Sequence, residues 1–264
     1  MGVFDGVADT LYIPLAARVT ASKRFPQYFY DAAALRLEAE LPSDSIQKNA
    51  SEYYTLASVA RYHNIDEMAR GFVAAHGACD IVNMGAGLET MHCRLADTGA
   101  TFYEIDMPRV IAHRRRALGI GENEVLIGGD LRMGDWMEQI ELKGAKLFVA
   151  CGVFMYWQEE EVRSLIGALQ ARFGGSELVF DAMSASALKF ANRHVRKTGN
   201  EGAKMGFSID NARAFARSSC TELLECRPFF RDIRSSLGKQ LKLSTRISMA
   251  FADGGMGKLV RLRL

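Results

Sequence analysis

The sequence predicts one α/β domain whose sheet is mostly parallel. From Asp80 onward, short apolar runs typical of buried strands alternate with helical patterns. Glycines or acidic residues follow most of these runs, at the positions where an open α/β sheet binds its ligand. No strand pattern precedes Asp80, so we divide the domain into an N-terminal helical cap, residues 1–78, and an α/β core, residues 79–264.

The cap is predicted to be helical from about residue 8 to residue 76. Pro26 and the segment 42–45 interrupt the pattern, because proline lacks the backbone N–H that a helix interior needs. The stretch 46–76 is long enough for two helices, and we expect a joint near His63-Asn64. Such a cap would cover a ligand and shape a substrate pocket.

The core is predicted to contain seven extended runs. They cover residues 81–84, 101–105, 124–128, 145–151, 177–181, 221–229 and 258–263. The helical patterns between them cover residues 88–97, 108–117, 133–140, 159–172, 185–196, 209–218 and 231–249. This alternation favours a parallel sheet with helices on both faces.

A glycine turn, Gly85-Ala86-Gly87, follows the first strand of the core. Glycine at these positions lets a ligand approach the backbone closely. The second strand ends in Glu104 and Asp106, about 20 residues farther along. Strand, glycine turn, helix, strand and acid form the first half of a nucleotide-binding unit, and the acid lies where ribose hydroxyls would bind.

The turn does not favour a dinucleotide. A dinucleotide site has a third glycine where this chain has Thr90, and no basic residue beside the turn replaces the missing phosphate contacts. An adenosyl ligand without phosphates, such as S-adenosylmethionine, fits better, and a nicotinamide-dependent dehydrogenase is disfavoured. The pattern alone leaves open a sheet with another ligand or with none.

Three further strand ends carry polar groups. Asp130 follows the third strand and could accept from an adenine amino group, while Leu131 could present its backbone N–H to a ring nitrogen. Cys151 follows the fourth strand, and the fifth ends at Asp181. Each acid could instead cap a turn, but acids at successive strand ends together favour a ligand site.

Composition argues against several classes of protein. The net charge is +2 and the only basic cluster is 113–116, so we expect no nucleic-acid partner. Five cysteines without paired spacing indicate free thiols, and no cysteine–histidine group has zinc-ligand spacing, so we expect no metal. The chain has no secretory signal pattern, and its longest apolar run, 147–157, is too short for a membrane span. We expect a soluble cytoplasmic protein, with its oligomeric state left open.

Several segments together resemble the leucine carboxyl methyltransferase family, which includes the tetracenomycin-type polyketide O-methyltransferases. The resemblance runs from about Leu11 to Phe180. Its carriers are IPLAARVTASKRF at 13–25, ARYHNID at 60–66, VNMGAGLETMHCRL at 82–95, FYEIDMPRVIAHRR at 102–115, the turn at 129–131 and CGVFMYW at 151–157. It implies the class I methyltransferase (Rossmann-like) fold, seven strands with the last one antiparallel, and S-adenosylmethionine as cofactor.

The resemblance also implies residue roles. Arg61 would pair with the methionyl carboxylate of the cofactor, and Lys23 would lie near cofactor and substrate. Tyr156 would lie beside the transferring methyl group. The implied cofactor-binding set is Lys23, Arg61, Gly85, Ala86, Gly87, Glu104, Asp106, Asp130, Leu131 and Cys151. One departure is Cys151, because many members carry glutamate at this position. A thiol keeps little of the attraction that a carboxylate has for the cofactor's amino group or sulfonium. Another is Glu89, which stands where aspartate is common.

The implied reaction is O-methylation of a carboxylate or hydroxyl on a small molecule, such as a polyketide or an aromatic acid. A carboxylate acceptor is already ionised at neutral pH, whereas a hydroxyl would need a base, for which Tyr156 and His194 are the candidates. Two alternatives remain, a methyltransferase for the terminal carboxylate of a protein and an S-adenosylmethionine-binding protein without transfer activity.

Overall fold

A seven-stranded sheet forms the centre of the computed structural model. The structure describes residues 11–41, 51–141, 144–197, 205–253 and 255–264, without the side chains of 194–197. The strands are β1 (Cys79–Met84), β2 (Thr101–Asp106), β3 (Glu124–Gly128), β4 (Ala145–Ala150), β5 (Glu177–Met183), β6 (Glu222–Pro228) and β7 (Gly257–Arg263). Each matches a predicted run to within a few residues. The strand predictions are therefore confirmed.

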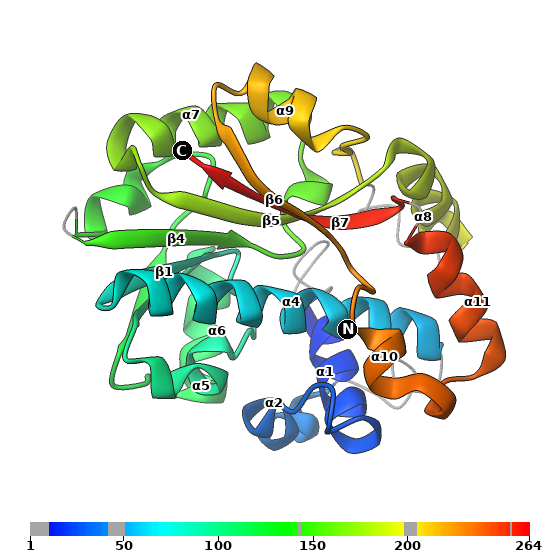
Figure 1. The fold of residues 1–264 in the computed structure, drawn as a ribbon. Coiled ribbons are helices and arrows are strands. Elements are labelled where there is room, and N and C mark those ends of the chain that lie inside the picture. Colours follow the sequence, from blue (N-terminus) through cyan, green and yellow to red (C-terminus); the bar gives the residue numbers. More distant parts are fainter. Residues whose placement is uncertain (1–10, 42–50, 142–143, 198–204, 254) are drawn as a thin grey trace.

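The strand order is β3-β2-β1-β4-β5-β7-β6 (Figure 1). β1 pairs in parallel with both β2 and β4, and β3 and β5 extend the parallel sheet on the two sides. β7 runs antiparallel to both of its neighbours, β5 and β6. The class I methyltransferase order with an antiparallel last strand is thus confirmed.

Helices cover both faces of the sheet (Figure 1). One face carries α1 (Tyr12–Arg24), α4 (Glu52–His76), α5 (Met91–Arg94), α6 (Pro108–Leu118), α10 (Ile233–Leu237) and α11 (Leu243–Ala252), and the other carries α7 (Glu159–Phe173) and α9 (Ala212–Ser218). Successive strand residues alternate between the two cores, since Ile81 packs with α4 and Val82 packs with α7. The remaining short elements are α2 (Ala32–Arg36), η2 (Glu38–Glu40), η3 (Ala96–Thr98), η4 (Asp135–Gln139), η5 (Phe154–Tyr156), α8 (Ala185–Lys197) and η7 (Gly238–Gln240).

The predicted joint near His63-Asn64 is wrong, because α4 is one continuous helix. Asn64 is fully buried, and its amide donates to the carbonyl oxygens of Ala60 at 2.7 Å and Phe229 at 3.0 Å. The polar side chain is therefore satisfied without breaking the helix. Leu56 and Phe72 bury against the sheet, so α4 is a layer of the core, while α1 lies farther out.

The predicted helix 88–97 is shorter than expected, since only α5 is helical and η3 follows it. Two carbonyls that a helix would use internally accept from distant arginines instead. Leu88 O accepts from Arg18 at 2.7 Å, and Glu89 O accepts from Arg114. The predicted helices at 133–140 and 231–249 are likewise broken, into η4 and into α10, η7 and α11.

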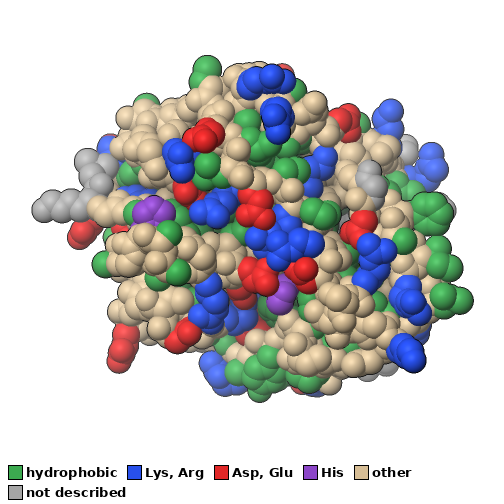
Figure 2. All heavy atoms as spheres, in the orientation of Figure 1, with side chains coloured by type: hydrophobic (Ala, Val, Ile, Leu, Met, Phe, Trp, Pro, Cys, Tyr) green, Lys and Arg blue, Asp and Glu red, His purple; other side chains and the backbone are tan. Residues whose placement is uncertain are grey.

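Acidic and basic side chains are interspersed over the face of the molecule that Figure 2 shows. Among the described residues, no helix combines the length and the apolar character that crossing a membrane requires.

Candidate active site

The glycine turn is fastened to the end of β2. The backbone N–H groups of Gly85 and Ala86 donate to Ile105 O at 2.8 and 2.9 Å, and Gly87 N–H donates to Asp106 Oδ2 at 2.8 Å. The turn and the acid that the sequence linked to one ligand thus lie in direct contact. They occupy the carboxyl edge of the parallel strands, where open α/β sheets bind ligands.

Two positions of the turn require glycine. Gly85 has φ +72° and Gly87 has φ +49°, in the left-handed region that side chains disfavour. A Cβ on Gly85 would overlap the side chain of Val153, and one on Gly87 would lie 2.7 Å from Leu11 Cδ2. The backbone of the turn is therefore closely covered by the loop after β4 and by the start of α1.

Asp106 is half-buried at the end of β2, and its Oδ1 accepts from Met107 N–H at 2.7 Å. Burial raises the pKa of Asp106, although the backbone donors of Gly87 and Met107 oppose the rise. Each carboxylate oxygen can accept more than one hydrogen bond, so the bonds already formed leave capacity for ribose hydroxyls.

The loop after β3 is joined to the same strand end, because Gly129 N–H donates to Asp106 O at 2.9 Å. In this loop Asp130 Oδ1 accepts from Arg132 N–H at 3.0 Å, which is the turn-capping role that an aspartate often has. Leu131 is buried, and its carbonyl accepts from Trp136 Nε1 at 3.4 Å. The structure places Asp130 and Leu131 beside Asp106, and their adenine contacts stay a prediction.

A charged group joins α4 to the ends of β4 and β5. Arg61 Nη1 donates to Asp181 Oδ2 at 2.7 Å, and Asp181 Oδ1 accepts from Gly152 N–H at 2.6 Å. Burial alone would lower the pKa of Arg61, but Asp181, together with Cys151 and Tyr62, outweighs it and raises that pKa above its ordinary value. Arg61 is therefore a permanent cation, and its guanidinium has donors beyond the one that Asp181 uses.

Cys151 lies among these charges as a neutral thiol. Burial raises its pKa, and the carboxylates of Asp181 and Glu89 raise it further, although Arg61 opposes them. A thiol with a raised pKa stays protonated at neutral pH and is neither a nucleophile nor a base. Cys151 is thus a small uncharged side chain at the end of β4.

The two candidate bases have different positions. Tyr156 is half-buried in η5, in the loop that also contains Cys151 and Gly152, so it belongs to the same strand end. His194 belongs to α8, but its side chain lies outside the described residues.

Lys23 lies on the surface, where its side chain is 51% exposed and pairs with Glu38 at 2.5 Å. Its contact with cofactor or substrate stays a prediction. The basic residue of α1 that reaches the turn is Arg18, which is 1% exposed and was not among the predicted site residues. Arg18 donates to Asp31 Oδ2 at 2.8 Å and to Thr90 Oγ1 at 2.5 Å. The local sign of the Arg18–Thr90 contact in the sequence is Thr90 itself, which occupies the position of the missing third glycine.

Glu104 does not share the exposed position of Asp106. Its side chain is fully buried, accepts from Asn83 Nδ2 at 2.9 Å, and lies 3.4 Å from Arg114 Nη2. No surface of Glu104 is left for a cofactor in this structure. Its role is in a buried cluster beneath the turn, which contains Glu104, Arg114, Glu124 and His92.

Arg114 is the centre of that buried cluster. Its Nη2 donates to Glu124 Oε1 at 2.7 Å and to His92 Nδ1 at 3.2 Å, while its Nη1 donates to Gly87 O at 3.2 Å and to Glu89 O. The side chain therefore ties the carbonyls of the glycine turn to two buried carboxylates. The His92, Glu104 and Glu124 ligand atoms lie within 4.8 Å of one another, close enough for a metal ion. Arg114 contacts all three and already supplies the positive charge, so we describe an ion-pair cluster.

Replacing Glu104 by glutamine is expected to remove a pH-dependent loss of stability. Burial raises the pKa of Glu104 to about 7, and Glu124 adds to the rise although Arg114 and Asn83 oppose it. Between pH 4.5 and 7 the folded chain then holds a proton that the unfolded chain has released. The free energy of unfolding consequently falls as pH rises through this window, by up to roughly 3 kcal/mol.

The contribution of His92 to stability changes with pH in the opposite direction. Burial lowers the pKa of His92, so its contribution to stability rises with pH toward 6.5. Comparing Glu104→Gln with the parent chain in urea at pH 5, 6 and 7 removes most of this common contribution. The free energy of unfolding of the variant should increase relative to that of the parent chain as pH rises. A stability difference that is the same at all three pH values would contradict the raised pKa of Glu104.

Glu89, two residues after the turn, is 7% exposed. Its Oε1 accepts from Thr90 N–H at 2.8 Å and pairs with Arg94 Nη1 at 2.7 Å. Its Oε2 is buried and has no hydrogen-bond partner in the structure. An orphaned carboxylate oxygen beside the turn fits a site built for a ligand that donates hydrogen bonds.

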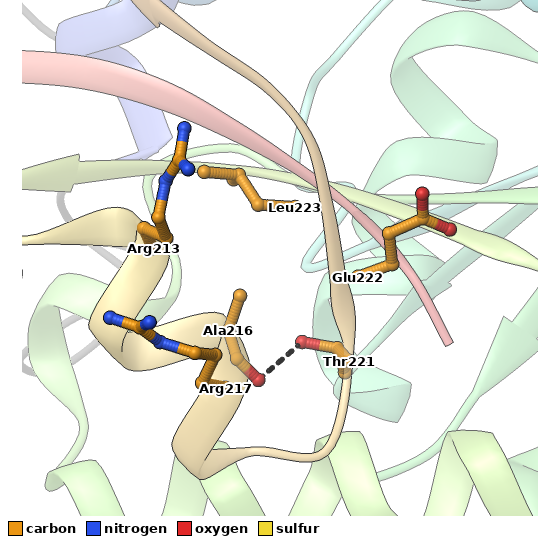
Figure 3. Close-up of a pocket in the computed structure, with 6 residues that line it drawn as sticks. All are labelled: Arg213, Ala216, Arg217, Thr221, Glu222 and Leu223. Carbon is orange, nitrogen blue, oxygen red and sulfur yellow. Dashed lines mark hydrogen bonds between the residues drawn. The ribbon is translucent and has the colours of Figure 1, made fainter.

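Two surface hollows lie away from the glycine turn. One, of about 300 Å³, is formed by Arg213 and Arg217 of α9 and by the chain that enters β6 (Figure 3). Because Glu222 and Glu177 pair with the same residue of β7, this hollow is level with the start of β5, at the opposite end of the sheet from the turn. The other, of about 240 Å³, is bordered by Tyr28, His63 and Arg70, and Asp66 and Arg94 also line it.

Comparisons with solved structures show the same fold. A DUF574 family protein from Streptomyces avermitilis MA-4680 is similar with a TM-score of 0.63 and 12% identity, over 94% of this chain and 96% of that one. A candidate methyltransferase from Thermobifida fusca YX is similar with a TM-score of 0.60 and 17% identity, over 94% of this chain and 93% of that one. An S-adenosylmethionine dependent methyltransferase from Mesorhizobium loti is similar with a TM-score of 0.54 and 17% identity, over 79% of this chain and 100% of that one. A search of curated proteins finds no match.

The family is shown by the sequence itself. A family model described as leucine carboxyl methyltransferase matches residues 11–170, which is more than half of the chain. The matched region contains the glycine turn, Asp106, Arg61 and the loop after β4. The chain therefore belongs to the leucine carboxyl methyltransferase family and is an S-adenosylmethionine-dependent methyltransferase.

Proposed function

We propose that the protein transfers the methyl group of S-adenosylmethionine to an oxygen of a small molecule, and that this oxygen belongs to a carboxylate. The observation that carries the proposal is the state of the groups at the ends of β4 and β5. Cys151 is a neutral thiol, and Asp181 is held by Arg61 at 2.7 Å. Neither of these two groups is set up to remove a proton from a hydroxyl acceptor, and Tyr156 at the same strand end is the candidate base if the acceptor is a hydroxyl.

The residues of the carboxyl edge would divide the cofactor among them. Asp106 would accept from the ribose hydroxyls, and Asp130 with the backbone of Leu131 would bind the adenine. Arg61 would donate to the methionyl carboxylate, for which a planar guanidinium fork is well matched. Gly85, Ala86 and Gly87 would form the backbone turn beside the ligand, as in other nucleotide-binding α/β sheets.

When bound, the cofactor would supply a sulfonium methyl group, whose carbon an acceptor oxygen could attack in line with the C–S bond. The C–O bond would form as the C–S bond breaks, and the bonding electrons would pass to sulfur, giving S-adenosylhomocysteine and a methyl ester. A carboxylate acceptor loses no proton, since it is ionised at neutral pH. The chain then contributes mainly by holding the reacting atoms about 3 Å apart and excluding water.

The test is methyl transfer from labelled S-adenosylmethionine to matched acceptors, such as an aromatic acid and the corresponding benzyl alcohol and phenol. We expect label only with the acid, and we expect alkali to release it as methanol, because esters hydrolyse and ethers do not. The rate should change little between pH 6 and pH 8, because no base is needed. An alkali-stable product, or transfer to the alcohol or phenol alone, would overturn the carboxylate assignment.

A peptide with a free carboxyl-terminal leucine, and the same peptide amidated, form a separate arm. Preference for the free peptide over all the small acids would move the acceptor from a small molecule to a protein terminus. The family assignment is compatible with both acceptors.

A further inference from the structure

We infer that Glu89 binds the ammonium group of the cofactor's methionyl segment, through the carboxylate oxygen that the fold leaves without a partner. The inference rests on the proposed cofactor site, and it assigns a role to a residue that lay outside the predicted set. Four observations carry it: the orphaned oxygen, its charge state, the charge balance around it and its position.

The two oxygens of Glu89 differ in their surroundings. Oε1 accepts from Thr90 N–H and pairs with Arg94, whereas Oε2 is buried and has no partner in the structure. A buried carboxylate oxygen without a donor is costly, and such a group in a folded protein calls for an explanation. A ligand that brings N–H donors to this oxygen supplies one.

Glu89 is ionised at neutral pH despite its burial. Burial alone would raise its pKa, but Arg94 and Arg18 outweigh that effect and hold the pKa below its ordinary value. The open oxygen is therefore part of a carboxylate, an acceptor without a proton of its own. It favours a cationic donor over a neutral one.

The buried charges around Glu89 leave an excess of negative charge. Three carboxylates, those of Glu89, Asp31 and Asp66, face two guanidiniums, those of Arg18 and Arg94. Burial raises the pKa of Asp66, and Glu89 and Asp31 add to the rise, although Arg94 opposes it. One more cation would balance the group, and an ammonium has both the charge and three donors.

The position of Glu89 selects the ammonium of the methionyl segment. Glu89 follows Gly87 by two residues, and its charge acts on the thiol of Cys151 at the end of β4. The charge of Arg61 also acts on this thiol, with the opposite sign. An amino acid group beside Cys151 would thus have a guanidinium for its carboxylate and Glu89 for its ammonium, and the neutral thiol offers no competing charge.

The experiment compares two ligands, S-adenosylhomocysteine and its analogue that lacks only the α-amino group, by calorimetry. The parent chain should bind the complete ligand about 10- to 100-fold more tightly than the analogue, since one charged hydrogen-bonded contact is lost. Glu89→Gln should weaken binding of the complete ligand by a similar factor and change binding of the analogue less than about twofold. This comparison does not depend on turnover.

Asp66→Asn is the matched control, because it also removes a carboxylate partner of Arg94 but leaves Glu89 in place. It should keep most of the preference of the parent chain for the complete ligand, because the direct contact with Glu89 remains. Equal weakening of both ligands by Glu89→Gln, or loss of the preference in Asp66→Asn, would show that the network only supports the fold and would overturn the inference.

The parent chain alone also decides the matter if Glu89→Gln does not fold. Equal affinity of the parent chain for the two ligands would overturn the role of Glu89. Failure of the parent chain to bind either ligand would instead count against the proposed cofactor site, so the two failures can be told apart.

Discussion

Arg114→Met is expected to lower the free energy of unfolding by about 3–5 kcal/mol, the usual result of removing one partner from a buried ion pair. Arg114 and Glu104 are fully buried and Glu124 is 1% exposed, so Glu124 would lose its counter-charge without access to water, and Glu104 would be driven further toward its protonated form. Methionine has a similar length, so the change in packing is small. Urea unfolding at pH 7 measures the difference.

Two further variants separate charge from packing. Adding Glu124→Gln to Arg114→Met should recover part of the loss, because the second change removes one of the uncompensated charges. Arg132→Met removes a partly exposed arginine that pairs with Glu161 at 2.7 Å, and it should cost less than about 1 kcal/mol. A loss of similar size in Arg114→Met and Arg132→Met would contradict the importance of the buried cluster.

Arg61→Ala is expected to weaken binding of S-adenosylhomocysteine by about 10- to 150-fold, equivalent to the 1.5–3 kcal/mol of one hydrogen bond to a charged group. The physical reason is the loss of the guanidinium that would meet the methionyl carboxylate. Calorimetry with the purified variant measures the affinity.

The variant also leaves Asp181 without its partner at 1% exposure, which would lower stability and could be mistaken for a binding effect. Asp181→Asn in the same background removes that charge, and the double variant should regain stability but not affinity. If the double variant binds the ligand as tightly as the parent chain does, Arg61 has no part in cofactor binding.

The sheet could be predicted from the sequence because most of its strands are short apolar runs followed by glycine or an acid. Parallel strands that are buried on both faces read as nearly continuous apolar runs. The turn and Asp106 could be predicted for a related reason. Their chemistry lies in consecutive elements of one βαβ unit, which brings them together without help from distant segments.

The remaining site residues depend on contacts between distant parts of the chain. Arg18 lies off the apolar face that Leu15 and Val19 form on its helix, and its burial depends on Asp31 and on Thr90, which is 72 residues away. The sequence suggests a joint at Asn64 because a polar residue within an apolar helix usually indicates exposure. In the structure Asn64 is buried instead, and its side-chain amide donates to Phe229 O. No local pattern contains these pairings.

Glu104 and Asp106 show where pattern reasoning reaches its limit. Residues two apart on a strand point to the same face, so the sequence gives them equal standing. The difference between them is depth. Asp106 is at the end of β2 and is half-buried, while Glu104 lies one pleat farther in, beneath His92 and Arg114.

The position of β7 has a consequence for the order in which the sheet assembles. β6 is made before β7, yet among the described strands β7 is its only neighbour and separates it from β5. During synthesis β6 must therefore wait unpaired, and a direct β5–β6 pairing would be a trap that has to be opened again. We infer that insertion of β7 is a late, slow event in folding, since it joins strands far apart in the chain.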